Sequence, residues 1–382
     1  MEKERKISIL QDVIRIKSVN GNEEEVAKYF QDLLKEYDIE SELVPWEEEG
    51  RSSLVATIKK GEGKVLGISG HLDVVAAGDE SQWKYPPYDA HIEDNKMYGR
   101  GSTDMKAGTT ALVLTLIEMK EEGIPFEGTI KLMLTVGEEV GELGAQQLTG
   151  MGYADDLDAL LIAEPTNYNI CYTHKGSINY TVESHGKSAH SSMPEEGINA
   201  INQLNEFITR VNQEMDQVTA DHENEILGKF THNITIINGG SQVNSIPDYA
   251  DVEANIRSIP EFSNDETIEL LEKIIDEINQ DIDGELKLNI DFNKQPVESD
   301  SNSELIQNIQ SFFDEDLPLI GISATTDAAE FTKADKEFDV VIFGPGVPNL
   351  PHQLDEYVEI DNYLDFIDVY KKLFPAYLSQ SE

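Results

Sequence analysis

A histidine and an aspartate stand two residues apart just after a short apolar run. Residues 65–68 read VLGI, which is typical of a buried strand, and the chain continues through His71 to Asp73. Successive side chains of a strand point to opposite faces, so His71 and Asp73 are expected on the same face. A histidine ring oriented by a neighbouring carboxylate is a recurring part of catalytic metal sites. Asp104, held between small residues in the segment YGRGSTDMKAG, is a further candidate ligand.

More acidic residues and a second histidine follow apolar runs in the same way. Glu138 and Glu139 come after the run at residues 129–136, Glu164 after 159–163, and His352, within a loop, after 339–343. Strands that alternate with helices predict an α/β protein with a mixed, mostly parallel sheet flanked by helices. Ligands bind beyond the carboxyl ends of the strands in such sheets. We therefore expect these side chains to meet at one edge of the sheet.

The middle of the chain has a different pattern. Residues 177–292 predict the order strand, helix, strand, strand, helix, strand, which is a ferredoxin-like α+β unit. Ser263 and Glu266 have the spacing of a capping box at the start of its second helix. Because His352 must return to join the earlier candidates, this unit interrupts the first domain. We predict a catalytic domain made of residues 1–176 and 293–382, and an inserted lid at residues 177–292.

Composition excludes several classes of partner. The 382 residues include 74 acids and 29 bases, for a net charge of −45, which disfavours nucleic acid and anionic membranes as partners. The sequence has no apolar run long enough to cross a bilayer, and MEKERK leads into no signal-peptide core. Cys171 is the single cysteine, so neither an internal disulfide framework nor a cysteine-based zinc site is possible. We expect a cytoplasmic protein.

Two histidines with several carboxylates suit Zn²⁺, with Co²⁺ or Mn²⁺ as alternatives. One metal with three ligands would leave carboxylates over. Two metals bridged by one carboxylate would use five residues: His71, Asp104, Glu139, Glu164 and His352. Glu138 would then remain as a free base beside an activated water, an arrangement that hydrolyses amides. The histidines without such a context are taken as structural or exposed: His91, His174, His185, His222 and His232.

The segments HLDVV, WKYPPYDAHIEDNKMYGRGSTDMKAG, GEEVGELGA, IAEPT and PHQLDE resemble the dinuclear metallo-aminoacylase family. The match runs over nearly the whole chain, and its nearest branch is the acetylornithine deacetylase/succinyl-diaminopimelate desuccinylase group. The resemblance implies a zinc-exopeptidase-like fold and an amidohydrolase that removes a succinyl or acetyl group from an amino acid such as diaminopimelate or ornithine. A dipeptidase or carboxypeptidase with the same machinery is the alternative. A metal-binding scaffold without turnover is less favoured, because such a protein needs no base like Glu138.

The resemblance also implies a role for each metal-site residue. His71 and Glu164 would bind the first metal, with Asp73 orienting His71. Glu139 and His352 would bind the second metal. Asp104 would bridge the two metals, and Glu138 would be the general base.

The resemblance extends to the lid. His190 resembles a family histidine that stabilises the oxyanion and often comes from the partner subunit, which implies a homodimer through the lid. Asn244 and Arg257 resemble lid residues that bind the substrate, and a guanidinium suits a bidentate grip on a carboxylate. The segment GISATTDAA would contact the substrate from the main domain through Ser323, Thr325 and Thr326. One position departs from the family pattern, because Asn255 stands where an aspartate often precedes the lid arginine.

Overall fold

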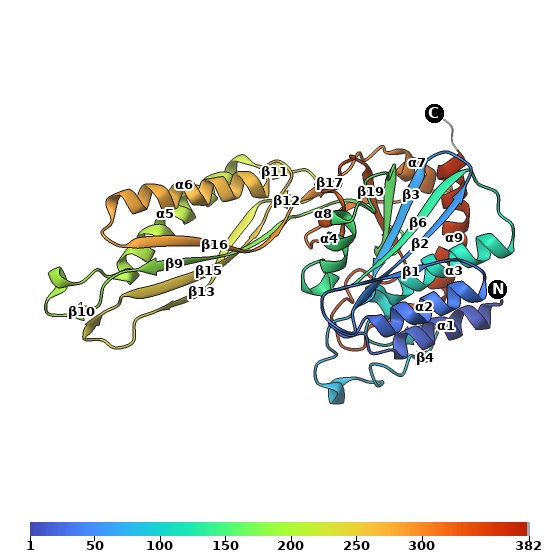
Figure 1. Ribbon diagram of the computed structural model, residues 1–382, viewed down its shortest axis with the longest axis horizontal. Helices are drawn as coiled ribbons and strands as arrows, with labels where there is room; N and C mark the ends of the chain where they lie inside the picture. Colours follow the sequence, from blue (N-terminus) through green and yellow to red (C-terminus); the bar gives the residue numbers. More distant parts are fainter. Residues whose placement is uncertain (380–382) are drawn as a thin grey trace. The chain divides into compact units, whose positions relative to one another are not determined.

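The computed structural model describes residues 1–379, which divide into two compact units (Figure 1). Unit 1 comprises Met1–Tyr172, Ser299–Ile320 and the chain from Thr326 onward. Unit 2 comprises Thr173–Glu298 together with Gly321–Thr325. Unit 2 therefore interrupts the sequence of unit 1. The role of a lid, which we predicted for residues 177–292, stays a prediction.

A nine-stranded mixed sheet provides the framework of unit 1, although β17 and the last residues of β8 and β18 fall within the bounds of unit 2. Its strands are β1 (Glu42–Pro45), β2 (Ser52–Lys60), β3 (Val65–His71), β6 (Gly128–Thr135), β7 (Ala159–Pro165), β8 (Ile170–His174), β17 (Val297–Glu298), β18 (Leu319–Ile322) and β19 (Asp339–Gly344). The order is β1-β2-β6-β3-β7-β19-β8-β17, with β18 beside β8. The four central strands, β6, β3, β7 and β19, run parallel, and the outer pairs are antiparallel. The carboxyl ends of the central strands therefore lie at one edge, as the sequence predicted.

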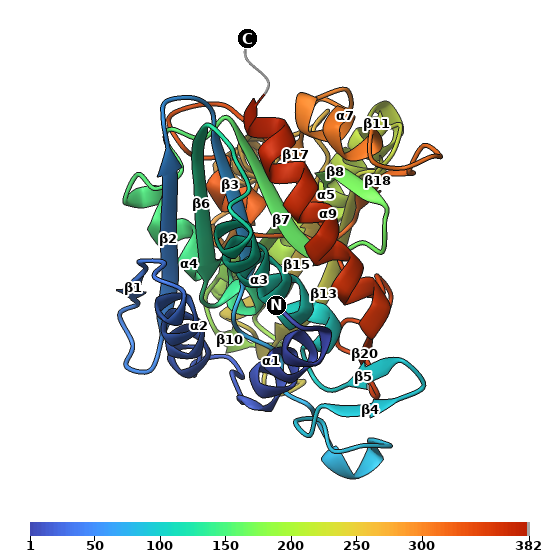
Figure 2. The same ribbon diagram turned by 90° about the vertical axis from the view of Figure 1, so that its right-hand side faces the viewer.

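Helices cover both faces of this sheet (Figures 1 and 2). One face carries α1 (Lys3–Arg15), α2 (Glu24–Glu36), α3 (Ala107–Glu121) and α9 (Ile360–Ser379), and the other carries α4 (Leu143–Gly150) and α8 (Ala328–Phe331). Another short helix, α7 (Glu304–Gln310), packs on α9 and β19. Every residue of α3 from Ala107 to Met119 is buried, because this helix lies between the sheet and α9. The α/β fold class predicted from the sequence is confirmed.

A small three-stranded sheet completes unit 1. It consists of β4 (His91–Glu93), β5 (Lys96–Tyr98) and β20 (Tyr357–Glu359), in the order β20-β5-β4. Its strands come from distant parts of the chain, and Tyr98 pairs with Tyr357. The pairing brings the segment before Asp104 next to the segment after His352.

Unit 2 is an antiparallel sheet with two helices. Its main elements are β9 (Ser177–His185), α5 (Ala200–Asp221), β13 (Thr231–Gly239), β15 (Tyr249–Arg257), α6 (Asn264–Asp281) and β16 (Glu285–Lys294). The sheet order β13-β15-β9-β16 is that of a ferredoxin-like unit, and the predicted capping box of Ser263 and Glu266 opens α6. Two strand pairs are short: β10 (Ala189–His190) with β14 (Ser245–Ile246), and β11 (Glu223–Asn224) with β12 (Gly228–Lys229). Among residues 1–379, no helix is both long and apolar enough to cross a membrane.

Candidate metal centre

The parallel strands deliver the candidate ligands to one edge of the sheet. His71 is the last residue of β3, and Glu164 lies at the end of β7. Glu138 and Glu139 begin a short 3-10 helix directly after β6. The turn before them requires glycine, because Gly137 has a φ of +65° and a Cβ there would lie 2.6 Å from Arg51 Nη2. The local fold thus presents both glutamates beside His71.

Asp104 lies between two groups of donor atoms. Its Oδ1 is 2.9 Å from His71 Nε2, and its Oδ2 is 3.5 Å from His352 Nε2. Glu164 Oε1 is 3.5 Å from the same nitrogen of His71, and Glu139 Oε1 is 3.0 Å from that of His352. The structure therefore brings together all five residues that the sequence singled out as ligands. They form two three-residue clusters that share Asp104.

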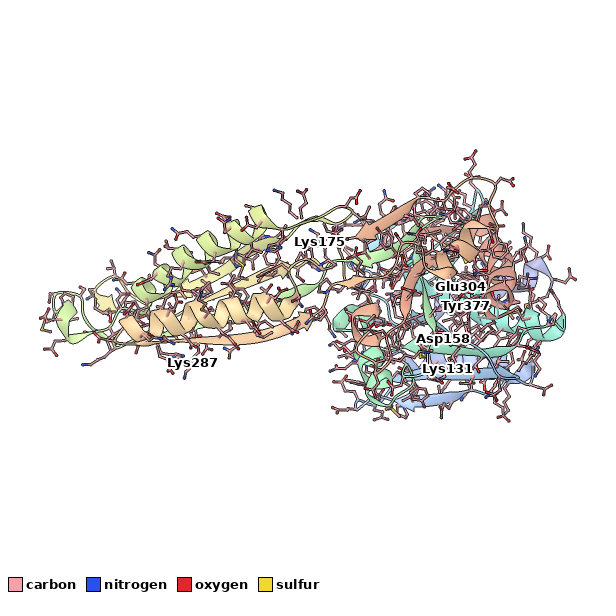
Figure 3. The ribbon with its side chains drawn as sticks, turned by 90° about the horizontal axis from the view of Figure 1, so that it is seen from above. Lys131, Asp158, Lys175, Lys287, Glu304 and Tyr377 are labelled. Carbon is pink, nitrogen blue, oxygen red and sulfur yellow. The ribbon has the colours of Figure 1, made fainter. Side chains whose placement is uncertain are left out.

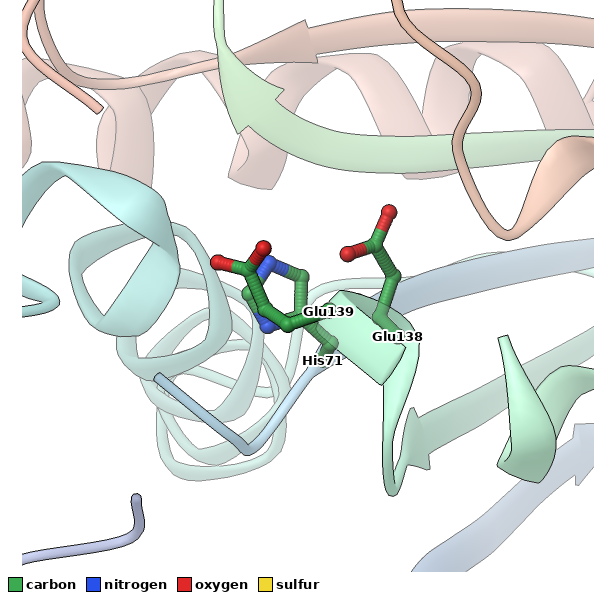
Figure 4. A group of neighbouring side chains, drawn as sticks. All are labelled: His71, Glu138 and Glu139. Atoms are coloured by element: carbon green, nitrogen blue, oxygen red, sulfur yellow. The ribbon is translucent and has the colours of Figure 1, made fainter. Parts of the chain in front are cut away.

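Glu138 lies close enough to join a third grouping. Donor atoms of His71, Glu138 and Glu139 all lie within 4.8 Å of one another (Figure 4). The Glu138 and Glu139 side chains leave the short helix in different directions. Glu138 is the one of these acids that belongs to neither cluster containing Asp104. That position suits a residue that acts as a base beside the metals and does not bind them.

Asp73 contacts both His71 and the turn that carries the two glutamates. His71 Nδ1 lies 2.9 Å from the backbone carbonyl of Asp73, whereas the nearer carboxylate oxygen is 3.6 Å away. The buried carboxylate instead accepts the backbone N–H groups of Glu138 and Glu139, both at 3.1 Å. The ring is thus oriented chiefly by a backbone carbonyl, which directs Nε2 toward the cluster. The Asp73 carboxylate positions the two glutamates.

The electrostatics of the cluster fit a bound cation. Burial raises the pKa of Glu138 and that of Glu164 well above their usual range, and neighbouring carboxylates add to the rise, although His71 opposes it. Burial acts to lower the pKa of His71, but Glu164 and Asp104 outweigh it and raise that pKa. Divalent cations would remove the repulsion among these carboxylates.

The types of donor atom and the distances between them also suit a bound divalent metal ion. Imidazole and carboxylate donors without thiolates suit Zn²⁺, Co²⁺ or Mn²⁺. Zinc bonds of about 2.0–2.2 Å in a tetrahedral site separate the donor atoms by roughly 3.4 Å. The four distances measured between histidine and carboxylate atoms, from 2.9 to 3.5 Å, are close to that value. The residues present can therefore hold the metal that the sequence predicted.

Three of the predicted substrate and oxyanion residues lie in the Thr173–Glu298 part of unit 2. His190 is exposed on β10 and shares a hydrogen bond with Ser192 (2.8 Å). The N–H of Ser191 donates to the backbone carbonyl of Asn244 (3.0 Å), so Asn244 directly precedes the strand that pairs with His190. Arg257 ends β15 and is half-buried, and its guanidinium makes no hydrogen bond or ion pair within residues 1–379.

Asn255 does not orient Arg257. Its amide donates to Asn179 (2.7 Å) and, weakly, to Ser177 (3.4 Å). The position where the family often has an aspartate is therefore used inside the sheet of unit 2. The guanidinium of Arg257 is left available for another partner.

Lys175 is a candidate that the sequence reading missed. It lies between β8 and β9 (Figure 3), is buried, and donates to the backbone carbonyl of Lys229. Burial lowers the pKa of Lys175, and the nearby charge of Arg257 lowers it further. Neither Lys175 nor Arg257 pairs with a carboxylate within residues 1–379, so the two cations are candidates for contacting an anionic group. A single lysine before a glycine carries no periodic signal, so sequence patterns could not reveal it.

The segment after β18 contains both accessible residues and residues with a structural role. Ser323 and Thr325 belong to Gly321–Thr325, which groups with unit 2, and Ser323 is exposed. Thr326 is buried, and its hydroxyl accepts the N–H of Ala328 at the start of α8. Thr326 therefore has a structural partner, whereas Ser323 remains accessible.

Comparison with known proteins agrees with this site. The family model described as Peptidase family M20/M25/M40 matches residues 67–375. A Staphylococcus aureus (strain MRSA252) protein described as a probable succinyl-diaminopimelate desuccinylase is 41% identical over 99% of this chain and 98% of its own length. The M20 metallo-carboxypeptidase Sso-CP2 from Sulfolobus solfataricus has a TM-score of 0.78 at 18% identity, with 99% of each chain covered. A Bacillus subtilis protein described as a dinuclear metal-binding M20 peptidase has a TM-score of 0.73 at 15% identity, with 98% of each chain covered.

The fold and the clustered donors define a metal-dependent hydrolase. The chain belongs to the M20/M25/M40 peptidase family and is an M20 metallohydrolase, a deacylase or peptidase. The family resemblance stated from the sequence motifs is confirmed.

Proposed function

We propose that this chain is a succinyl-diaminopimelate desuccinylase, which hydrolyses the amide between a succinyl group and the amino nitrogen of diaminopimelate. The observation that carries the proposal is the pair of donor clusters sharing Asp104, found in a chain 41% identical over nearly its full length to a probable desuccinylase. The solved structures at 18% identity or less support the fold alone.

The proposed centre holds two divalent ions, with Zn²⁺ first and Co²⁺ or Mn²⁺ as alternatives. His71 and Glu164 would hold one ion, Glu139 and His352 would hold the other, and Asp104 would contribute to both clusters. When bound, such ions would supply Lewis-acid polarisation of the scissile carbonyl and would lower the pKa of a bound water. Glu138 accepts the proton of the attacking water and returns it to the departing amine nitrogen. Its position outside both Asp104 clusters and its raised pKa support this role.

The proposed substrate contacts come from unit 2. Arg257 and Lys175 form an anion site for a substrate carboxylate, and Asn244, Ser323 and Thr325 supply polar contacts. Arg257 has no ion pair within residues 1–379, and this supports the proposed use, because burying an unpaired charge is costly unless a ligand compensates it.

A homodimer through unit 2 is also proposed, with His190 of one subunit stabilising the oxyanion in the other. Support comes from β13, an edge strand of its sheet. Ile236 and Ile237 on this strand are 46% and 63% exposed. An open edge with exposed apolar side chains is suited to pairing with a second copy.

Initial rates on three kinds of substrate test the proposal: N-succinyl-diaminopimelate, N-acetylornithine and a panel of dipeptides. Each is measured with metal-free protein, and again after adding Zn²⁺ or Co²⁺. We expect the highest kcat/KM on N-succinyl-diaminopimelate and almost no turnover without metal. A higher kcat/KM on N-acetylornithine would make the protein a deacetylase, and a higher value on a dipeptide would make it a peptidase. Either result overturns the proposed substrate.

A further inference from the structure

We infer that Glu356 is a positioning residue that fixes the bridging Asp104 and the distant His352 relative to each other. The inference rests on the proposed two-metal centre. It concerns a carboxylate that touches no metal donor atom and that lies four residues after His352. Its evidence is a set of hydrogen bonds that join two loops from opposite ends of the sequence.

The first loop is the irregular segment that carries Asp104. Asp104 has φ −115° and ψ 96°, and Met105 is also outside helical geometry, so N–H groups here lack the acceptors that a regular helix supplies. Three of them donate to the Glu356 carboxylate instead. The backbone nitrogens lie 3.0 Å away for Gly101, 2.9 Å for Thr103 and 3.0 Å for Asp104. One carboxylate therefore sets the path of the backbone through the bridging residue.

The second loop is reached through Arg100. Glu356 is fully buried, and its charge is paired with Arg100 Nη1 at 2.7 Å. The same guanidinium donates to the carbonyl of Gln353 at 3.2 Å and to that of His352 at 3.4 Å. His352 has φ +64°, an uncommon conformation for a residue other than glycine, so its backbone needs such support. Arg100 itself stacks over Trp83, with 5.0 Å to the ring.

Other hydrogen bonds hold the two loops together independently of the Glu356 and Arg100 side chains. The N–H of Gly99 donates to the backbone carbonyl of Glu356 (2.9 Å), and the Thr103 hydroxyl donates to that of Tyr357 (2.6 Å). Strands β5 and β20 pair immediately beside them. A substitution of the Glu356 side chain therefore removes the carboxylate without removing the framework, and the variant is expected to fold.

The two metal positions depend unequally on the contacts that Glu356 and Arg100 make with these loops. The cluster of Asp104, Glu139 and His352 takes two of its three ligands from the connected loops. The cluster of His71, Asp104 and Glu164 takes only Asp104 from them, because its other ligands lie on strand ends. Loss of the Glu356 carboxylate should therefore weaken the His352 metal more than the His71 metal.

Glu118 provides a matched control. Like Glu356, it is a buried carboxylate of unit 1 paired with basic groups: Lys6 Nζ at 2.5 Å and Lys371 Nζ at 2.8 Å. It lies on α3 and belongs to none of the metal groupings. Glu118→Gln and Glu356→Gln thus both remove a buried, paired charge, but only the second touches the loops of the metal centre.

Titration of metal-free protein with Co²⁺ alone tests the inference, with binding followed by visible absorption and calorimetry. His352→Ala is expected to lose one of the two binding steps, which identifies the step that belongs to the His352 cluster. Glu356→Gln should weaken that step by about 10–100-fold, the usual cost of removing a group that orients metal ligands. The other step should weaken less, and Glu118→Gln should leave both steps unchanged. Arg100→Lys keeps the positive charge but loses the planar set of N–H donors of the guanidinium. This variant should also lower the Co²⁺ affinity of the His352 step.

Each result has a distinct meaning. Wild-type affinity at both steps of Glu356→Gln, or an equal loss at both steps, overturns the inference. An equal loss in Glu118→Gln also overturns it, since the effect would then follow from destabilisation in general. Binding of only one Co²⁺ by the wild-type protein would instead contradict the two-metal centre on which the inference rests.

Discussion

The carboxylate of Asp73 accepts the backbone N–H of Glu138 at a distance of 3.1 Å. Asp73 lies two residues beyond the end of β3 and Glu138 three residues beyond the end of β6, so the bond connects two neighbouring parallel strands where both end. The second carboxylate oxygen accepts the N–H of Glu139. One buried charge thus positions the proposed base and a proposed ligand together.

Asp73→Asn should reduce catalysis while the fold persists. An amide offers one acceptor oxygen, and its NH₂ group would face the remaining N–H, so the turn that carries the two glutamates would shift. We expect kcat to fall about 10–100-fold. Asp79→Asn is a suitable control, because the Asp79 side chain also accepts a backbone N–H, from Ser81 at 3.0 Å, in an exposed segment. Unchanged kcat in Asp73→Asn would contradict the positioning role.

Glu138→Gln should separate chemistry from metal binding. The amide keeps the shape of the side chain but cannot accept the proton of water, so kcat should fall by about 10²–10⁴. Metal analysis of the purified variant should still find both ions. Glu139→Gln is the matched comparison, because it removes a proposed ligand and should lower metal content. Full activity in Glu138→Gln would remove Glu138 from the role of base.

Arg257→Met should weaken substrate binding more than turnover. A hydrogen bond between charged groups is worth about 1.5–3 kcal/mol, so KM should rise roughly 10–100-fold with a smaller change in kcat. Lys175→Met should also raise KM. Arg210→Met is the control in the same unit, because Arg210 pairs with Glu277. An unchanged KM in both Arg257→Met and Lys175→Met would exclude the proposed anion site.

Mixing two inactive variants tests whether His190 acts across a dimer. His190→Ala and Glu138→Gln are each expected to have little activity. In a mixed dimer, one site would combine the intact Glu138 of one subunit with the intact His190 of the other, so mixing with subunit exchange should restore part of the activity. Sedimentation would establish the oligomeric state independently. A monomeric wild-type protein with full activity would rule out the exchange of His190.

The stability of the protein should fall in acid partly because of His174. Burial lowers the pKa of His174 to about 4 from an ordinary value of 6.5. Between these pH values the unfolded chain binds the proton and the folded chain does not, so the free energy of unfolding decreases as pH falls from 6.5 toward 4. The loss for one such group reaches about 3 kcal/mol. Urea unfolding of metal-free protein at pH 7.5 and 4.5 should show a smaller loss in His174→Gln, and equal losses would contradict the assignment.

The sequence was sufficient to predict the strand ends but not the contacts between them. Apolar runs followed by His71, Glu139 and Glu164 predicted correctly which residues would meet, because parallel strands end at one edge of a sheet. The same periodicity predicts the face of the sheet on which a side chain lies. It does not predict the backbone group with which that side chain forms a hydrogen bond. The bonds of Asp73 to the glutamates depend on how two strand ends approach in space, and no local pattern encodes that approach.

Residues that act through tertiary contacts were the hardest to recognise. Glu356 stands only four residues from His352, inside a motif quoted for the family resemblance, yet its three backbone partners lie some 250 residues earlier. Lys175 acquires its meaning only from the position of Arg257. In an acidic chain, one more glutamate or a single lysine is unremarkable until the fold shows its neighbours.

The insertion of unit 2 within unit 1 has a consequence for the order in which the protein is made. The ribosome delivers β3, β6 and β7 first, and then the whole of Thr173–Glu298 before β19 and His352. Domains fold as units during synthesis, so the ferredoxin-like sheet can be complete while the large sheet still lacks the strand between β7 and β8. The cluster of Asp104, Glu139 and His352 therefore stays incomplete until the chain beyond unit 2 has been made, so the candidate metal centre can form only after unit 2 has been synthesised.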